Sequence, residues 1–402
     1  MKGGHGVANT TTIDVAQMAC DRHDRLQAAL GERDVAAAVL LHGPNVGYAT
    51  GLPPTGDDAT HAYFQRDVAV VVSGAPRPHL FTDRPIGSDG VRLSVEHHDG
   101  LFPELDEGAV ALGAALDELV GAGDRVAVDD LTGAMLRAGV PAGGEPMDAG
   151  RLVGAAKLCK TADEIACIDE AQRRTELAMT KVREALRPGV HRRELVGVFL
   201  ADLAEQGAGA NLIDPIFQPM PRSIADGPRT TTGHVAFPVA QQDWVYEEGD
   251  LVWVDAGVDH LGYASDYGRT WVIGREPSAE EQGCFDRWTA VVAAAETTIR
   301  PGASLGDVGR AAVAADGGKV PWLPHFYLAH GLGIESAEMP MIGTDLGPAF
   351  DDGFVLAEGM TLVLEPVVWH DGHGGYRAEE VTVVTADGCR RLGGDAGYEP
   401  FT

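Results

Sequence analysis

Two aspartates lie inside an apolar stretch of the chain that has the pattern of a β-hairpin. Asp255 and Asp266 belong to L-V-W-V-D-A-G-V-D-H-L-G-Y-A-S-D-Y-G-R-T, residues 251–270, whose arms are rich in β-branched and aromatic residues. If the chain reverses near His260 and Leu261, the two aspartates face each other with Cβ atoms roughly 4.5–5.5 Å apart. Carboxylates at that distance repel unless they are protonated or neutralised by cations. The pattern indicates a cation site, although two exposed hairpin acids would have the same spacing.

A second hairpin, nearer the C-terminus, repeats this arrangement with glutamates. The strand E-G-M-T-L-V-L-E-P ends in Glu365, and after H-D-G-H-G-G the chain returns as Y-R-A-E-E-V-T-V-V-T, which places Glu379 opposite Glu365. Between the two hairpins, His330 lies in A-H-G-L-G-I-E-S-A-E-M-P, where the flanking glycines leave room for a neighbouring group. Four carboxylates and one imidazole form an oxygen-rich ligand set whose charge two divalent ions would balance. This set favours Mn, with Co, Fe or Zn as alternatives, whereas a structural zinc site would use cysteines.

The order Asp255, Asp266, His330, Glu365, Glu379, with the local motifs D-A-G, S-D-Y-G-R-T, H-G-L-G and Y-R-A-E, resembles the pita-bread metallopeptidase superfamily. This superfamily includes prolidase, aminopeptidase P and methionine aminopeptidase, together with creatinase and the dimethylsulfoniopropionate lyases. The resemblance implies that all five residues bind two metal ions, which activate a water between them as the nucleophile. It implies a hydrolase of the Xaa-Pro dipeptidase or aminopeptidase P type that acts on a small peptide or amide. Glu365 or Glu379 would then also serve as the catalytic proton shuttle.

One position departs from the peptidase pattern. The peptidases carry a second histidine in H-G-x-G-x-x-x-H-E-x-P, which contacts the substrate carbonyl, and Ala337 stands in its place here. His234, upstream of the first hairpin, and His325, five residues before His330, are the candidate catalytic replacements, although His325 could equally be a packed core residue. Loss of one such donor typically costs about 10²–10³ in rate. We therefore expect Xaa-Pro peptides to be poor substrates unless another group has taken over this role.

Two other reactions stay open at this point. One is a metal-dependent elimination resembling that of the dimethylsulfoniopropionate lyases, and the other is hydrolysis of a small non-peptide C–N bond. Release of proline or of a free amine would identify a hydrolase, and release of an alkene would identify a lyase.

Arg269 and Arg377 each follow or precede a predicted ligand closely in the sequence. We expect these two arginines, together with Thr270, to orient the ligand carboxylates rather than to bind substrate. The alternative for both arginines is an ordinary surface ion pair.

The elements that must position these residues indicate a mixed α/β (α+β) protein with two domains. The alternating helix and strand pattern of residues 1–155 resembles the N-terminal domain of creatinase and prolidase, which implies a homodimer. Residues 156–402 resemble the pita-bread catalytic domain, and the pseudo-twofold symmetry that this resemblance implies agrees with a repeat in the sequence. Capping boxes at Thr161 and Ser278 begin two long helices, and each helix is followed by R-P-G and a second helix.

Composition excludes several classes of partner. The formal net charge of −29 over 402 residues would repel nucleic acid and anionic membranes. The chain has no apolar run long enough for a membrane span and does not open with a signal peptide, so we expect a cytoplasmic protein with a small-molecule or short-peptide substrate. The five cysteines are odd in number and scattered, which implies neither a disulfide framework nor a thiolate metal site.

Overall fold

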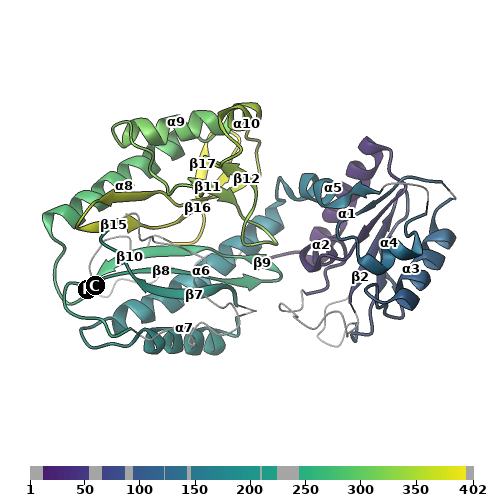
Figure 1. Cartoon of the computed structure of the whole chain (residues 1–402), viewed down its shortest axis with the longest axis horizontal. Helices are drawn as coiled ribbons and strands as arrows, with labels where there is room; N and C mark the ends of the chain where they lie inside the picture. Colours follow the sequence, from purple (N-terminus) through teal and green to yellow (C-terminus); the bar gives the residue numbers. More distant parts are fainter. Residues whose placement is uncertain are drawn as a thin grey trace.

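The computed structural model describes residues 12–53, 66–86, 94–121, 123–142, 146–208, 211–223 and 244–394. The chain forms two lobes, shown in Figure 1. The N-terminal lobe contains one sheet, and the C-terminal lobe contains strands that lie between two groups of helices. None of the helices in the described part of the chain is both long enough and apolar enough to cross a membrane.

The N-terminal lobe is built on a six-stranded mixed sheet of order β4-β3-β2-β1-β5-β6. Its central strand β1 (Ala37–Leu40) pairs antiparallel with β2 and parallel with β5. Apolar side chains cover both faces of the sheet, which explains why the central strands read as continuous hydrophobic runs. The other strands are β2 (Val68–Val72), β3 (His79–Phe81), β4 (Glu96–His98), β5 (Val126–Val128) and β6 (Met147–Asp148). The helices are α1 (Val15–Arg33), α2 (Gly43–Thr50), α3 (Asp106–Leu119), α4 (Gly133–Ala138) and α5 (Ala149–Lys157).

Two helices connect this lobe to the first metal-site hairpin. Helix α6 (Ala162–Ala185) begins at the predicted capping box, in which the Thr161 hydroxyl accepts from the Glu164 N–H and the Glu164 carboxylate accepts from the Thr161 N–H. Helix α7 (Arg192–Gln206) packs against α6. The predicted division at residue 155 falls within α5.

The first hairpin has a different register from the predicted one. Strand β8 (Leu251–His260) pairs antiparallel with β9 (Tyr263–Ala264) and β10 (Tyr267–Val272), and β7 (Asn211–Pro219) pairs with the other edge of β8. Asp255 pairs with Gly268, not with Asp266 as predicted. The reversal occurs at Leu261 and Gly262, both with positive φ (53° and 84°), because a two-residue turn of this kind matches the twist of the strands. Asp266 is therefore displaced by two residues along the hairpin from the position opposite Asp255.

The second hairpin has the predicted register. Strand β13 (Thr361–Leu364) pairs with β16 (Glu380–Val384), with Leu364 opposite Glu380, and β14 (Val367–His370) pairs with β15 (Gly374–Arg377), with Val367 opposite Arg377. Glu365 and Glu379 lie between these two ladders in the same register, and therefore face each other. The sheet continues through β11 (Ala329–Gly331) to β12 (Glu338–Ile342) on one side and to β17 (Cys389–Arg391) on the other.

The helix pair of the first half has a counterpart in the second half. Helix α8 (Ala279–Thr298) begins at the predicted capping box of Ser278 and Glu281, and packs against α9 (Leu305–Ala315). A short helix, α10 (Pro348–Gly353), follows β12. Figure 1 shows α8 and α9 above the strands of this lobe and α7 below them. The repeated order of two helices followed by a carboxylate-bearing hairpin is the pseudo-twofold pattern predicted from the sequence, and it brings both hairpins to the middle of the lobe.

Candidate metal centre

The structure brings the five predicted ligands together inside the C-terminal lobe. Asp255 lies on β8, Asp266 lies in the bend between β9 and β10, and His330 lies on β11. Glu365 immediately follows β13, and Glu379 immediately precedes β16. All five are at most 5% exposed. Two sheets therefore deliver their acidic side chains to one buried point.

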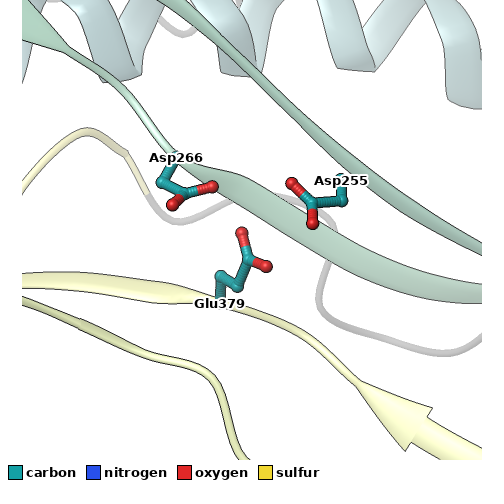
Figure 2. Close-up of side chains that lie close together, drawn as sticks. All are labelled: Asp255, Asp266 and Glu379. Carbon is teal, nitrogen blue, oxygen red and sulfur yellow. The ribbon is translucent and has the colours of Figure 1, made fainter. Parts of the chain in front are cut away.

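Three of the carboxylates form a compact group, drawn in Figure 2. One oxygen from each of Asp255, Asp266 and Glu379 lies within 4.8 Å of the other two. His330 connects this group to the fourth carboxylate, because its Nε2 lies 3.3 Å from Asp266 Oδ2 and 3.3 Å from Glu365 Oε1. Oδ1 of Asp266 is buried without a hydrogen-bond partner among the described residues. A buried carboxylate oxygen in this state is costly unless a cation binds it, so the donor set fits divalent metal ions.

Arg377, on β15, provides positive charge at this point. Its Nη2 donates to Glu365 Oε2 at 2.6 Å, to Glu379 Oε1 at 2.8 Å and to Asp255 Oδ2 at 3.1 Å. The guanidinium is buried and lies 4.9 Å from the centre of the Trp253 ring. The prediction that Arg377 orients ligand carboxylates agrees with this geometry, and a surface ion pair does not.

The pKa values in the cluster reflect the crowding of negative charge. Burial raises the pKa of Asp255 to about 7 and raises the pKa of Glu379 well above its ordinary value. Burial also acts on Glu365, but the charge of Arg377 and the hydrogen bond from His330 outweigh it and lower the pKa of Glu365. For His330, burial disfavours the imidazolium, yet contacts with Asp266 and Glu365 raise its pKa to about 10. The cluster thus takes up protons because four adjacent buried carboxylates need compensating positive charge.

Backbone contacts fix the position of the hairpins relative to each other. The Glu379 N–H donates to the carbonyl of Gly268 at 3.0 Å, and a Cβ at position 268 would lie 2.6 Å from Glu379 Cδ. The Arg269 guanidinium donates to the Glu379 carbonyl at 2.8 Å, and the Thr270 hydroxyl donates to the Arg377 carbonyl at 2.7 Å. In these hydrogen bonds, Arg269 and Thr270 contact the backbone on either side of the ligand side chains and not the ligand carboxylates themselves.

The cluster lines a cavity of about 180 Å³. Its remaining walls come from Arg377 and from the two segments that flank His330: Phe326 and Tyr327 before it, Ser336 and Ala337 after it. No motif in the sequence marks Phe326, Tyr327 or Ser336 as site residues. Their closeness to His330 along the chain was the available signal.

Of the two histidines predicted as catalytic replacements, His325 and His234, the structure describes only His325. The His325 imidazole is 85% exposed and lies 2.8 Å from Asp345 Oδ2, and His325 is not among the residues that line the cavity. His234 lies outside the described residues.

A second cavity, of about 370 Å³, lies beside the first, between the N-terminal lobe and residues 335–341. Lys157 contacts Glu335 in this cavity and donates to Asn45 Oδ1 at 3.2 Å. The His42 Nε2 lies 3.1 Å from Glu335 Oε1. Ala337 lines both cavities. The N-terminal lobe thus contacts the segment that forms one wall of the metal centre.

Comparison with known families matches both lobes. The family described as metallopeptidase family M24 matches residues 166–386, and the creatinase/prolidase N-terminal domain matches residues 22–153. These two matches confirm the resemblance to the pita-bread superfamily that the sequence motifs indicate.

Among curated relatives, the Xaa-Pro dipeptidase of Pyrococcus furiosus is 28% identical over 238 residues, which cover 59% of this chain and 63% of that protein. The probable dipeptidase PepE of Mycobacterium tuberculosis is 30% identical over 238 residues, 58% of each chain. The chain thus spans about three fifths of the length of these relatives.

Solved structures share the fold over a longer stretch. A recombinant prolidase from Thermococcus sibiricus superposes with a TM-score of 0.76 at 22% identity, covering 98% of this chain and 100% of that one. An Xaa-Pro dipeptidase from Bacillus anthracis gives a TM-score of 0.73 at 22% identity, covering 96% and 100%. At this level of identity the likeness establishes the fold.

Proposed function

Because the chain belongs to metallopeptidase family M24, we propose that it is a metal-dependent peptidase of the Xaa-Pro dipeptidase type. The observation that carries the proposal is the buried cluster of four carboxylates and His330 at the wall of one cavity. A cluster of this kind is costly to bury without cations, and family members with a related sequence bear the name Xaa-Pro dipeptidase.

We propose that Asp255, Asp266, His330, Glu365 and Glu379 hold two divalent ions, with manganese as the preferred metal. Ions bound there would supply Lewis-acid activation of water and of the substrate carbonyl. Glu365 or Glu379 accepts the proton of the attacking water and passes it to the leaving nitrogen, because both carboxylates border the cavity. Arg377 keeps three ligand carboxylates in one orientation through its Nη2 contacts.

The size of the cavity supports a small substrate. Its volume of about 180 Å³ is below the roughly 300–1,000 Å³ of pockets that enclose drug-sized ligands. A dipeptide fits this limit better than a long peptide does. The names of the relatives favour an Xaa-Pro dipeptide, and they favour hydrolysis over the lyase reaction that the sequence left open.

The test is a side-by-side assay of the manganese-loaded protein. Ala-Pro and Gly-Pro are compared with Ala-Ala, with an Xaa-Pro-Xaa tripeptide and with dimethylsulfoniopropionate. We expect release of free proline from the Xaa-Pro dipeptides, loss of this activity on chelation and its return with Mn²⁺. Alkene release from the sulfonium compound, or no turnover of any proline peptide, would contradict the proposal.

We also propose a homodimer, on the basis of the creatinase/prolidase-type N-terminal domain. Light scattering should give a mass near twice 42.3 kDa. A monomer mass across micromolar concentrations would refute this assembly.

A further inference from the structure

Hydrolysis of a peptide bond is accelerated by a hydrogen-bond donor beside the carbonyl oxygen, in addition to any activation by metal ions. Negative charge develops on this oxygen in the transition state, and a donor held in place beforehand stabilises it. Ala337 has no side-chain donor, and Phe326 has none either. His330 is engaged, because its Nδ1 lies 2.9 Å from the Gly331 carbonyl oxygen and its Nε2 faces two carboxylates. Among the described residues that line the cavity, Tyr327 and Ser336 are the ones whose side chains carry a hydroxyl, a neutral hydrogen-bond donor.

Tyr327 has the more fixed position of the two. Its ring stacks on Phe326, with 4.1 Å between the ring centres and 17° between the planes. Its ring also meets the His330 imidazole edge-on, with 5.3 Å between the ring centres. Tyr327 is half-buried at the cavity wall, and no hydrogen bond within the described part of the chain engages its hydroxyl, which leaves this group available to a bound substrate. Ser336 lies in an irregular stretch between β11 and β12 and lacks ring contacts of this kind.

We propose that Tyr327 is a catalytic residue whose hydroxyl donates a hydrogen bond to the substrate carbonyl oxygen as charge develops there. The proton stays on the tyrosine, so the contribution is a hydrogen bond and not a proton transfer. The inference rests on the proposed peptidase function. It explains how a peptidase site can work with alanine at position 337.

The first test is Tyr327→Phe, which removes the hydroxyl and keeps the ring that packs on Phe326 and His330. We expect kcat and kcat/KM for Ala-Pro to fall together by about 10²–10³, with KM within about threefold of the wild type. Manganese content and thermal stability should not change. The matched control is Tyr246→Phe, because the Tyr246 hydroxyl is buried in a separate core cluster and has no partner within the described residues.

Three kinetic outcomes would overturn the assignment. The first is a kcat for Tyr327→Phe within threefold of the wild type. The second is a loss of activity that parallels a loss of manganese, because this would indicate a structural role. The third is a comparable loss in Ser336→Ala with Tyr327→Phe unaffected, which would make Ser336 the donor.

A binding measurement separates this inference from the proposed function. The probe is a phosphinic isostere of Ala-Pro, whose tetrahedral phosphorus carries oxygens where the transition state carries charge. Calorimetry on the manganese-loaded proteins should show that Tyr327→Phe binds the isostere about 10²–10³-fold more weakly than the wild type does. The affinities of the two proteins for proline should agree within threefold. If the wild type binds the isostere in this way but releases no proline, the proposed function fails and the assignment of the donor stands. Equal binding by both proteins, or no binding by the wild type, would overturn the assignment.

Discussion

Replacement of Arg377 by glutamine should make the stability of the protein depend more strongly on bound metal. The Arg377 Nη2 contacts three buried carboxylates at 2.6–3.1 Å, and its side chain is 4% exposed. Removal of one partner from a buried ion pair typically costs about 3–5 kcal/mol, because the other charge is left uncompensated. With about 2–4 °C of melting temperature per kcal/mol for a domain of 150–250 residues, the metal-free variant should melt roughly 6–20 °C below the metal-free wild type.

The assay is thermal unfolding at pH 8 in a chelator and in excess Mn²⁺. Manganese should shrink the difference between variant and wild type, because metal ions then supply the positive charge that Arg377 no longer provides. Arg310→Gln is the control, since Arg310 pairs with Asp307 and Asp352 at the surface and its loss should change little. If metal-free Arg377→Gln melts within about 2 °C of the metal-free wild type, Arg377 does not stabilise the carboxylate cluster.

Three further changes test other parts of the structure. Burial raises the pKa of Glu176 to about 7, so its ionisation lowers stability as pH rises from about 4.5 through 7. In denaturant unfolding, the free energy of unfolding of Glu176→Gln should exceed that of the wild type by up to about 3 kcal/mol above pH 7, and the two should be equal at pH 4. A difference between the two proteins that does not change with pH would contradict this. Gly268→Ala should displace the Glu379 carboxylate and lower manganese content in elemental analysis, whereas Gly283→Ala, which has open space, should not. Burial raises the pKa of Glu335, but the neighbouring cationic groups outweigh burial and lower this pKa to about 2. The contacts of ionised Glu335 therefore stabilise the protein above pH 4.5, and this stabilisation is lost as the pH falls towards 2. The melting difference between Glu335→Gln and the wild type should therefore shrink from pH 6 to pH 3.

Much of the candidate site could be predicted from the sequence because each ligand lies in a short local pattern. Asp255 and Glu365 end or interrupt apolar strands, where an acid is unexpected, and the opposite arm of each hairpin carries a second acid. The capping box at Thr161 likewise depends on residues three positions apart. Patterns of this kind need no knowledge of how distant elements pack.

Other features of the site could not be predicted, because they depend on turn geometry and on contacts between residues far apart in the sequence. The offset of Asp266 follows from a turn at Leu261 and Gly262, one residue later than the sequence pattern predicts. The contact of Lys157 with Glu335 joins residues 178 positions apart. The exposure of His325 and the place of Tyr327 in the cavity wall follow from the path of the chain before β11, which has no regular pattern.

A count of metal ions in the wild type and in Asp266→Asn tests the metal centre directly. Elemental analysis after manganese loading and removal of free metal should give about two ions per chain for the wild type. The variant should lose metal and proline-releasing activity together, because Asp266 lies within 4.8 Å of two other carboxylates and contacts His330. Full activity of the wild type after exhaustive chelation, or unchanged metal content in Asp266→Asn, would contradict the assignment of this cluster as the metal centre.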